Sequence, residues 1–179
     1  MAHRLLEEIL EPGDRCIDAT VGNGHDTAFL ARAVGERGRV FGFDVQPEAI
    51  ESTRTRLESE ELAERATLFQ ECHSRIGDWI EGEVKAVMFN LGYLPGGDKE
   101  RITRPDTTLA AIETASGLLA SGGRMTLVVY PGHAGGDIEA EAVERWAGAR
   151  DQETFGVAAY RFLNQANSPP FLIVISKKK

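Results

Sequence analysis

The residues with the clearest capacity for chemistry lie in a glycine-containing segment near the N-terminus, residues 18–27, with the sequence DATVGNGHDT. Glycine allows a backbone to turn tightly and to approach a ligand closely. The helix expected after such a turn presents unpaired N–H donors to that ligand. A simple turn would explain the glycines, but not the acid that precedes them. We therefore predict a ligand-binding loop formed by Asp18, Thr20, Gly22, Asn23, Gly24 and Asp26.

The spacing of a second acidic residue from the glycine loop indicates what that residue could bind. Asp44 ends an apolar stretch and stands 26 residues after Asp18. An acid at this position can accept hydrogen bonds from both hydroxyls of an adenosine ribose, and Gln46 is placed to contact the edge of the adenosine. A carboxylate at a strand end also often caps the next helix. The spacing from the glycine loop favours ribose binding.

The glycine loop also discriminates between nucleotide ligands. A dinucleotide site requires the pattern G-x-G-x-x-G, but Thr27 stands where the third glycine would be. No small residue then brings the helix close beneath a pyrophosphate. Asp18 suits a ligand that carries a positively charged aminoacyl group and no phosphate. The pattern favours S-adenosylmethionine over NAD, so an NAD oxidoreductase ranks third among the alternatives.

Two more segments follow apolar stretches and could complete a site. Backbone from Cys72 and the ring of His73 are placed to contact a base edge, although His73 is equally suited to capping the next helix. Asn90 offers both a donor and an acceptor to an amine or a base edge. Tyr93 can stack on a nucleobase, but an aromatic residue after a strand is as often part of the core. The glycines around it fit either a loop that closes over substrate or a passive turn.

Alternating strand and helix patterns position these residues. Connections this short imply a mainly parallel sheet covered by helices on both faces. Two final strands without an intervening helix imply an antiparallel end. We predict one α/β domain over residues 1–179, with a Rossmann-like seven-stranded sheet and one antiparallel strand near the C-terminus. The expected strands are 14–18, 39–44, 66–70, 84–90, 124–130, 153–162 and 171–176, and the expected helices are 3–10, 26–34, one opening at Pro47, 76–80, 107–120 and 137–147.

The composition of the chain limits the cellular location and the binding partners that we expect for it. No apolar run reaches the roughly 20 residues that span a bilayer, and the N-terminus lacks a signal-peptide pattern, so we expect a cytoplasmic protein without a membrane partner. Two cysteines and four scattered histidines form no metal-ligand spacing, so no metal is expected. A net charge of −8 argues against broad neutralisation of nucleic acid. RNA recognised through a local basic patch or a partner subunit remains possible.

Five segments resemble the YtqB-type rRNA methylase family, whose better-defined members are similar to tRNA 5-aminomethyl-2-thiouridine methyltransferases of the MnmM type. They cover nearly the whole chain, and NLGYLPGGDK and NQANSPP are far more specific than a glycine loop. The resemblance implies a class I methyltransferase fold. It also implies methyl transfer from S-adenosylmethionine to the exocyclic amine of 5-aminomethyluridine at the wobble position of the tRNA anticodon stem-loop. The segments are DATVGNGHDTAFLA, VFGFDVQ, AVMFNLGYLPGGDK, TRPDTTLAAI and FLNQANSPPFLIVISK.

The resemblance also implies roles for individual residues. Asn23, Asp44, Gln46 and His73 would line the cofactor, and Asn90 would face the acceptor. Asp98 is a candidate for taking the proton of the amine, although a carboxylate on a glycine-flanked loop is more often simply solvated. The residues expected to contact the acceptor base are Tyr93, Leu94, Pro95 and Gly96, and those expected to contact phosphate are Lys99, Arg101 and Arg104.

The acceptor itself is not specified by a fold. A methyltransferase that acts on rRNA or a small molecule is the nearest alternative. A non-catalytic module that binds S-adenosylmethionine is the alternative outside enzymes. A homodimer is a further expectation, because a small acidic domain gains RNA-contact area by pairing.

Overall fold

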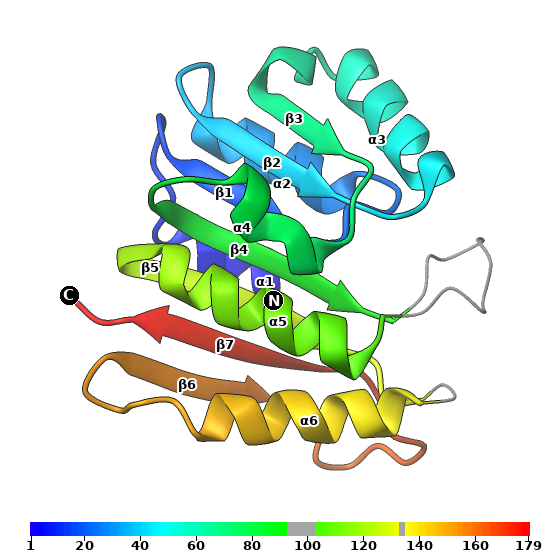
Figure 1. Cartoon of the computed structure of the whole chain (residues 1–179), viewed down its shortest axis with the longest axis vertical. Helices are drawn as coiled ribbons and strands as arrows, with labels where there is room; N and C mark the ends of the chain where they lie inside the picture. Colours follow the sequence, from blue (N-terminus) through cyan, green and yellow to red (C-terminus); the bar gives the residue numbers. More distant parts are fainter. Residues whose placement is uncertain (93–102, 133–134) are drawn as a thin grey trace.

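A seven-stranded sheet forms the centre of the computed structural model, which describes residues 1–92, 103–132 and 135–179 (Figure 1). The strands lie in the order β3-β2-β1-β4-β5-β7-β6. Their bounds are β1 (Arg15–Asp18), β2 (Arg39–Phe43), β3 (Ala66–Phe69), β4 (Val84–Leu91), β5 (Leu119–Val129), β6 (Phe155–Tyr160) and β7 (Phe171–Lys177).

Strand directions bring the predicted site residues to one edge. The pairs among β1 to β5 are parallel, whereas β7 runs antiparallel to both β5 and β6. The five parallel strands therefore end at the same edge of the sheet, which is where ligands bind in open α/β sheets. This confirms the predicted fold. The insertion of β7 between β5 and β6 was not predicted.

Helices cover both faces of the sheet (Figure 1). Apolar side chains from α1, α2 and α3 pack in one core cluster, through Leu6, Leu30 and Leu57. Those from α4, α5 and α6 pack in the other. The helices are α1 (Ala2–Glu7), α2 (His25–Val34), α3 (Pro47–Ser59), α4 (Ile76–Trp79), α5 (Pro105–Leu118) and α6 (Gly136–Gly148), with short 3-10 helices at Ala63–Arg65 and His73–Arg75.

The central strand β4 has an almost continuously apolar sequence because both of its faces are buried. Helices cover both of its faces, so residues of either orientation are buried, including Val87, Met88 and Phe89. The chain enters α3 and α5 through Pro47 and Pro105 at the first turn. Proline is favoured there because its missing N–H would have had no partner inside the helix.

The boundary between α5 and β5 corrects one prediction. The expected helix 107–120 and strand 124–130 are replaced by α5, which ends at Leu118, and β5, which begins at Leu119. Gly122 has a φ of 69°, and the β4–β5 pairing shifts register across this stretch. The glycines therefore form a bulge inside the strand, where a positive φ is tolerated, and do not end the helix.

No helix in the described part of the chain combines the length and apolarity needed to cross a membrane.

The turn between β1 and α2 packs directly against α3. The Thr53 hydroxyl donates to the Gly22 carbonyl at 3.0 Å, and Arg56 Nε donates to the Asn23 carbonyl at 2.8 Å. Gly24 has a φ of 77°, and a Cβ added there would lie 2.9 Å from the Thr53 Cα. The loop therefore depends on a residue without a side chain at position 24.

Replacing Gly24 by alanine should destabilise the fold by at least about 1–2 kcal/mol, the cost of a left-handed conformation for a residue with a Cβ. The contact with α3 backbone adds to that cost. Gly117→Ala is the matched control, because Gly117 is exposed in α5 with nothing within 4 Å of an added Cβ. This control should gain roughly 0.5–1 kcal/mol. Urea unfolding measures both, and equal stability of the two variants would contradict this account.

Candidate functional site

A pocket of about 690 Å³ opens at the edge where the parallel strands end. Segments that follow β1, β2, β3, β4 and β5 all contribute to its wall, as the topology requires. The structure therefore brings together most of the residues predicted from separate parts of the sequence. Predicted residues in this wall are Thr20, Gly22, Asn23, Asp26, Asp44, Gln46, Cys72, His73, Asn90 and Arg104.

The remaining predicted residues fall into two groups. Asp18 and Gly24 do not line the pocket and lie beneath it, inside the turn. The others lie outside the described residues, and they are Tyr93, Leu94, Pro95, Gly96, Asp98, Lys99 and Arg101.

Asp18 supports the glycine loop from below. Its side chain is fully buried, and its two oxygens accept hydrogen bonds from the Thr20 N–H at 3.2 Å and the Thr27 hydroxyl at 2.6 Å. Burial, together with the nearby Asp26 and Asp44, raises the pKa of Asp18 to about 7. Thr27, which replaces the third glycine of a dinucleotide motif, is thus a structural partner of this acid.

Asp44 joins the ends of β1 and β2. Its carboxylate accepts hydrogen bonds from the Gly22 N–H at 3.1 Å and the Gln46 N–H at 3.0 Å. Burial raises the pKa of Asp44, while these backbone donors lower it. The carboxylate is held in a fixed orientation at the pocket wall, where a ribose can reach its oxygens.

Asn90, at the end of β4, is tied to the glycine loop. Its backbone N–H donates to the Thr20 hydroxyl at 2.7 Å, and its side-chain Nδ2 donates to Asp26 Oδ2 at 2.6 Å. The residue expected to face the acceptor is therefore positioned by the residues expected near the cofactor.

His73 presents a buried ring nitrogen to this region. The residue is 8% exposed, and Nε2 has no hydrogen-bond partner among the described residues. Burial lowers the pKa of His73 to about 4, so the ring is neutral near pH 7. The short helix that begins at His73 has Cys72 as its N-cap, and that residue makes no side-chain capping hydrogen bond.

Tyr130 and Glu139 are two of the residues around the pocket that were not predicted. Tyr130 follows β5 and lines the pocket; burial raises the pKa of Tyr130, and Asp26 adds to the effect. Glu139, on α6 and 2% exposed, accepts hydrogen bonds from the hydroxyls of Thr103 at 2.6 Å and Thr108 at 2.7 Å. The Thr103 N–H donates to the Gly92 carbonyl at 2.9 Å. Glu139 thus fixes one side of the pocket, through contacts that no local sequence pattern signals.

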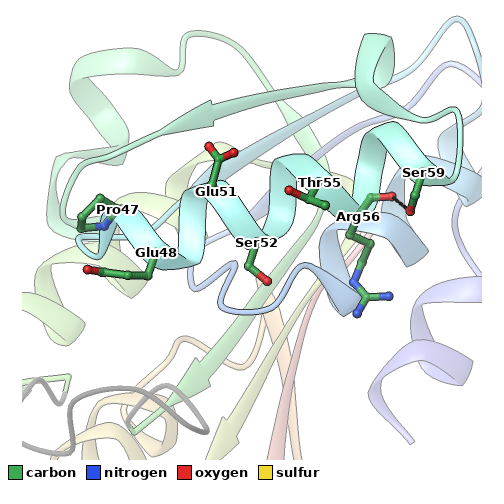
Figure 2. Close-up of a pocket in the computed structure, with 7 residues that line it drawn as sticks. All are labelled: Pro47, Glu48, Glu51, Ser52, Thr55, Arg56 and Ser59. Carbon is green, nitrogen blue, oxygen red and sulfur yellow. Dashed lines mark hydrogen bonds between the residues drawn. The ribbon is translucent and has the colours of Figure 1, made fainter.

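Figure 2 shows a second hollow of comparable volume, about 760 Å³, along α3. One helix supplies all of its lining, and no strand end contributes to it. The hollow therefore lacks the convergence of separate elements found at the sheet edge, which is the better candidate site. Its lining residues are Pro47, Glu48, Glu51, Ser52, Thr55, Arg56 and Ser59.

Comparison with known proteins agrees with this geometry. The family described as "Putative rRNA methylase" matches residues 40–176. This chain belongs to the rRNA methylase family. The chloroplastic tRNA (mnm(5)s(2)U34)-methyltransferase of Arabidopsis thaliana is 38% identical to this chain over 188 residues, which covers 99% of this chain and 69% of the relative.

Solved structures resemble the family member over nearly its whole length. A "putative rRNA-methylase" from Clostridium thermocellum is 47% identical with a TM-score of 0.96, covering 98% of this chain and 95% of that one. SMU.1697c, a "putative methyltransferase" from Streptococcus mutans solved in complex with SAH, is 39% identical with a TM-score of 0.90 and the same coverage. These findings confirm the predicted family and methyltransferase class.

The buried Asp18 predicts a pH dependence of stability. The folded carboxyl keeps its proton up to about pH 7, whereas the unfolded one loses it near the ordinary value of 3.8. The folded state then binds more protons in this window, so the unfolding free energy contributed by Asp18 falls as pH rises through it. Asp18→Asn cannot ionise and should show a flatter profile between pH 4 and 7, measured by urea unfolding. Parallel profiles for the two proteins would rule out this role.

Proposed function

We propose that this chain transfers a methyl group from S-adenosylmethionine to the exocyclic amine of 5-aminomethyl-(2-thio)uridine at the tRNA wobble position. The observation that carries the proposal is the 38% identity, across 99% of the chain, to a tRNA (mnm(5)s(2)U34)-methyltransferase. The donor is supported by the family and by the SAH complex of the Streptococcus mutans protein. An S-adenosylmethionine-dependent methyltransferase is the broader statement that contains this proposal.

The pocket wall suits the proposed donor. Asp44 is oriented by two backbone N–H groups, and the unpartnered His73 Nε2 offers a nitrogen for the polar edge of an adenine. Asn23, Asp44, Gln46 and His73 would hold the cofactor, which supplies a methyl group already activated by its sulfonium. The protein's main contribution is then alignment, which is worth about 7–11 kcal/mol in favourable systems.

The charge of the wall suits a cationic acceptor. Asp26, Asp44 and Glu71 all line the pocket. An alkyl amine resembles lysine, with a pKa of about 10.4, and is mostly protonated at neutral pH. The carboxylates attract this cation, while Asn90 is placed to orient its nitrogen. The amine must lose a proton before it can act as a nucleophile.

RNA contact is proposed at one margin of the pocket. Arg104 is exposed and lies in the wall, with Asp106 at 3.3 Å. Lys99 and Arg101, proposed to extend this patch toward phosphate, lie outside the described residues, as does the proposed proton acceptor Asp98. A local patch of this kind is compatible with the net charge of −8.

The single catalytic domain over 1–179, the cytoplasmic location and the homodimer stay proposals. For the homodimer, β6 is the candidate surface because it lies at the edge of the sheet. Val157 and Tyr160 on this strand are 41% and 46% exposed, and Phe162 and Leu163 beyond it are more exposed still. Pairing of two copies along this edge would bury apolar surface and cover unpaired backbone groups.

The acceptor is tested with undermodified tRNA whose wobble uridine carries the 5-aminomethyl group, together with isotope-labelled S-adenosylmethionine. We expect mass spectrometry to find one labelled methyl group on that nucleoside and none on tRNA lacking the aminomethyl group. Label found only in ribosomal RNA would favour the rRNA alternative. Cofactor binding without transfer to any RNA would favour the non-catalytic module.

The cofactor site is tested by Asp44→Asn and Asp44→Ala, which should weaken S-adenosylmethionine binding about tenfold or more, since hydrogen bonds to a charged group contribute roughly 1.5–3 kcal/mol. Calorimetry measures the affinity. Glu48→Ala is the matched control, because it removes a carboxylate from the α3 hollow (Figure 2). Unchanged affinity in the Asp44 variants, or a loss in Glu48→Ala, would contradict the assignment.

Asn90→Ala should lower the turnover number more than it lowers the affinity for S-adenosylmethionine, because Asn90 is proposed to orient the acceptor.

A further inference from the structure

The N-terminal helix α1 reaches the site through His3. The His3 Nε2 lies 2.5 Å from Asp26 Oδ1, although the two residues are 23 positions apart. The imidazole also stacks on Phe29, with ring centroids 3.9 Å apart and planes at 6°. The His3 side chain is 44% exposed and that of Asp26 is 19% exposed. An imidazole in contact with solvent is thus held in a fixed orientation against a carboxylate of the pocket wall.

The other oxygen of Asp26 faces Asn90. Asn90 Nδ2 donates to Asp26 Oδ2 at 2.6 Å, while the Asn90 backbone N–H is held by the Thr20 hydroxyl. This bond directs the amide NH₂ toward Asp26. The amide Oδ1 is then the end of Asn90 that can accept an N–H from an amine. Three elements, α1, α2 and β4, therefore converge on one line of hydrogen bonds.

The proposed reaction releases one proton. A primary ammonium loses a proton, and the freed lone pair of the nitrogen forms the new N–C bond. The S–C bond breaks, and its electron pair stays on sulfur. The products are a secondary ammonium, a thioether and one proton, so the charges balance. The proton released by the acceptor ammonium must then be transferred from the pocket to solvent.

We propose that Asn90, Asp26 and His3 form a proton-accepting relay at the acceptor end of the pocket. Asn90 Oδ1 orients the amine, Asp26 accepts its proton, and His3 passes that proton to water. His3 does not line the pocket and acts through Asp26, so it is a positioning and relay residue. This inference rests on the proposed function, because it requires an ammonium acceptor.

The two other described histidines, His25 and His73, do not share this geometry. His25 Nε2 lies 3.2 Å from the Arg56 guanidinium, a cation. His73 is buried and its Nε2 has no partner among the described residues. His3 combines a carboxylate partner with access to solvent, which is what transfer of a proton out of the site requires.

Full-length variants at position 3 test the relay. His3→Ala should lower turnover on 5-aminomethyluridine tRNA by about tenfold or more, since positioned acid–base groups contribute roughly 10²–10⁴-fold. Affinity for S-adenosylmethionine should stay within about twofold of the original protein, because His3 lies outside the pocket wall. His3→Gln keeps a hydrogen-bond donor, but its amide cannot take up and release a proton, so it should be as slow as His3→Ala. Arg4→Ala, an exposed change on the same helix, is the matched control and should retain full turnover.

Added imidazole provides a second readout that a structural role would not move. It should partly restore turnover of His3→Ala by occupying the place over Phe29, and it should not restore Asp26→Asn. Wild-type turnover in His3→Gln, or no rescue of His3→Ala, overturns the relay. A loss in Asp26→Asn confined to cofactor affinity also overturns it, because Asp26 would then be a cofactor ligand.

Failure of the relay and failure of the proposed function give different results. If the wild-type protein methylates no aminomethyluridine tRNA, the proposed function is wrong and the relay is wrong with it. If the wild-type protein is active but the position 3 variants behave otherwise than expected, only the relay is wrong.

Discussion

One buried carboxylate holds both sides of the pocket in register. Asp18 accepts hydrogen bonds from the Thr20 N–H and the Thr27 hydroxyl, which fixes the turn after β1. The Thr20 hydroxyl in turn accepts from the backbone of Asn90, and Thr27 adjoins Asp26 on α2. A change in the position of Asp18 would therefore move the proposed donor and acceptor groups together. Burial of this acid is costly unless it is hydrogen-bonded, and its raised pKa reflects that cost.

The acids of the site also act on one another. Asp26 and Asp44 both raise the pKa of Asp18, and Asp26 contributes to the raised pKa of Tyr130. Such a concentration of like charge is unfavourable in the free protein, but it is relieved when a cation enters. The same acids would repel a phosphate backbone. Recognition of RNA at this edge therefore needs the local basic residues proposed near Arg104, and the wall itself is suited to an aminomethyl group.

Sequence patterns were sufficient to bring most of the predicted cofactor residues to one edge of the sheet. The glycine loop, Asp44 and His73 lie in the segments that follow β1, β2 and β3, so a correct assignment of parallel strands places them at one edge. The prediction was less accurate for Asp18, which was expected to contact the ligand. A buried acid and a ligand-facing acid at a strand end have the same local sequence, and they differ only in whether a hydroxyl such as that of Thr27 reaches them.

Sequence patterns were insufficient where contacts join distant segments. The insertion of β7 beside β5 depends on strand pairing across more than forty residues. Tyr130, Glu139 and His3 each reach the site from elements whose local patterns show only a strand end or an amphipathic helix. The end of the expected helix 107–120 was misplaced because a glycine pair can end a helix or form a bulge in a strand, and Gly122 and Gly123 lie inside β5.

This division between local and distant contacts has a functional consequence. The proposed cofactor groups come from the segments that follow β1, β2 and β3, and the glycine loop and Asp44 are fixed by hydrogen bonds within the first two of these segments. The proposed acceptor side contacts α1 through His3–Asp26 and α6 through Glu139, which accepts hydrogen bonds from Thr103 and Thr108. Substitutions in α1 or α6 can therefore alter the acceptor side while Asp44 and its backbone partners stay in place. Acceptor specificity can change in such a fold while the cofactor site is conserved, which is why the family's fold by itself leaves the acceptor to be established at the level of individual side chains.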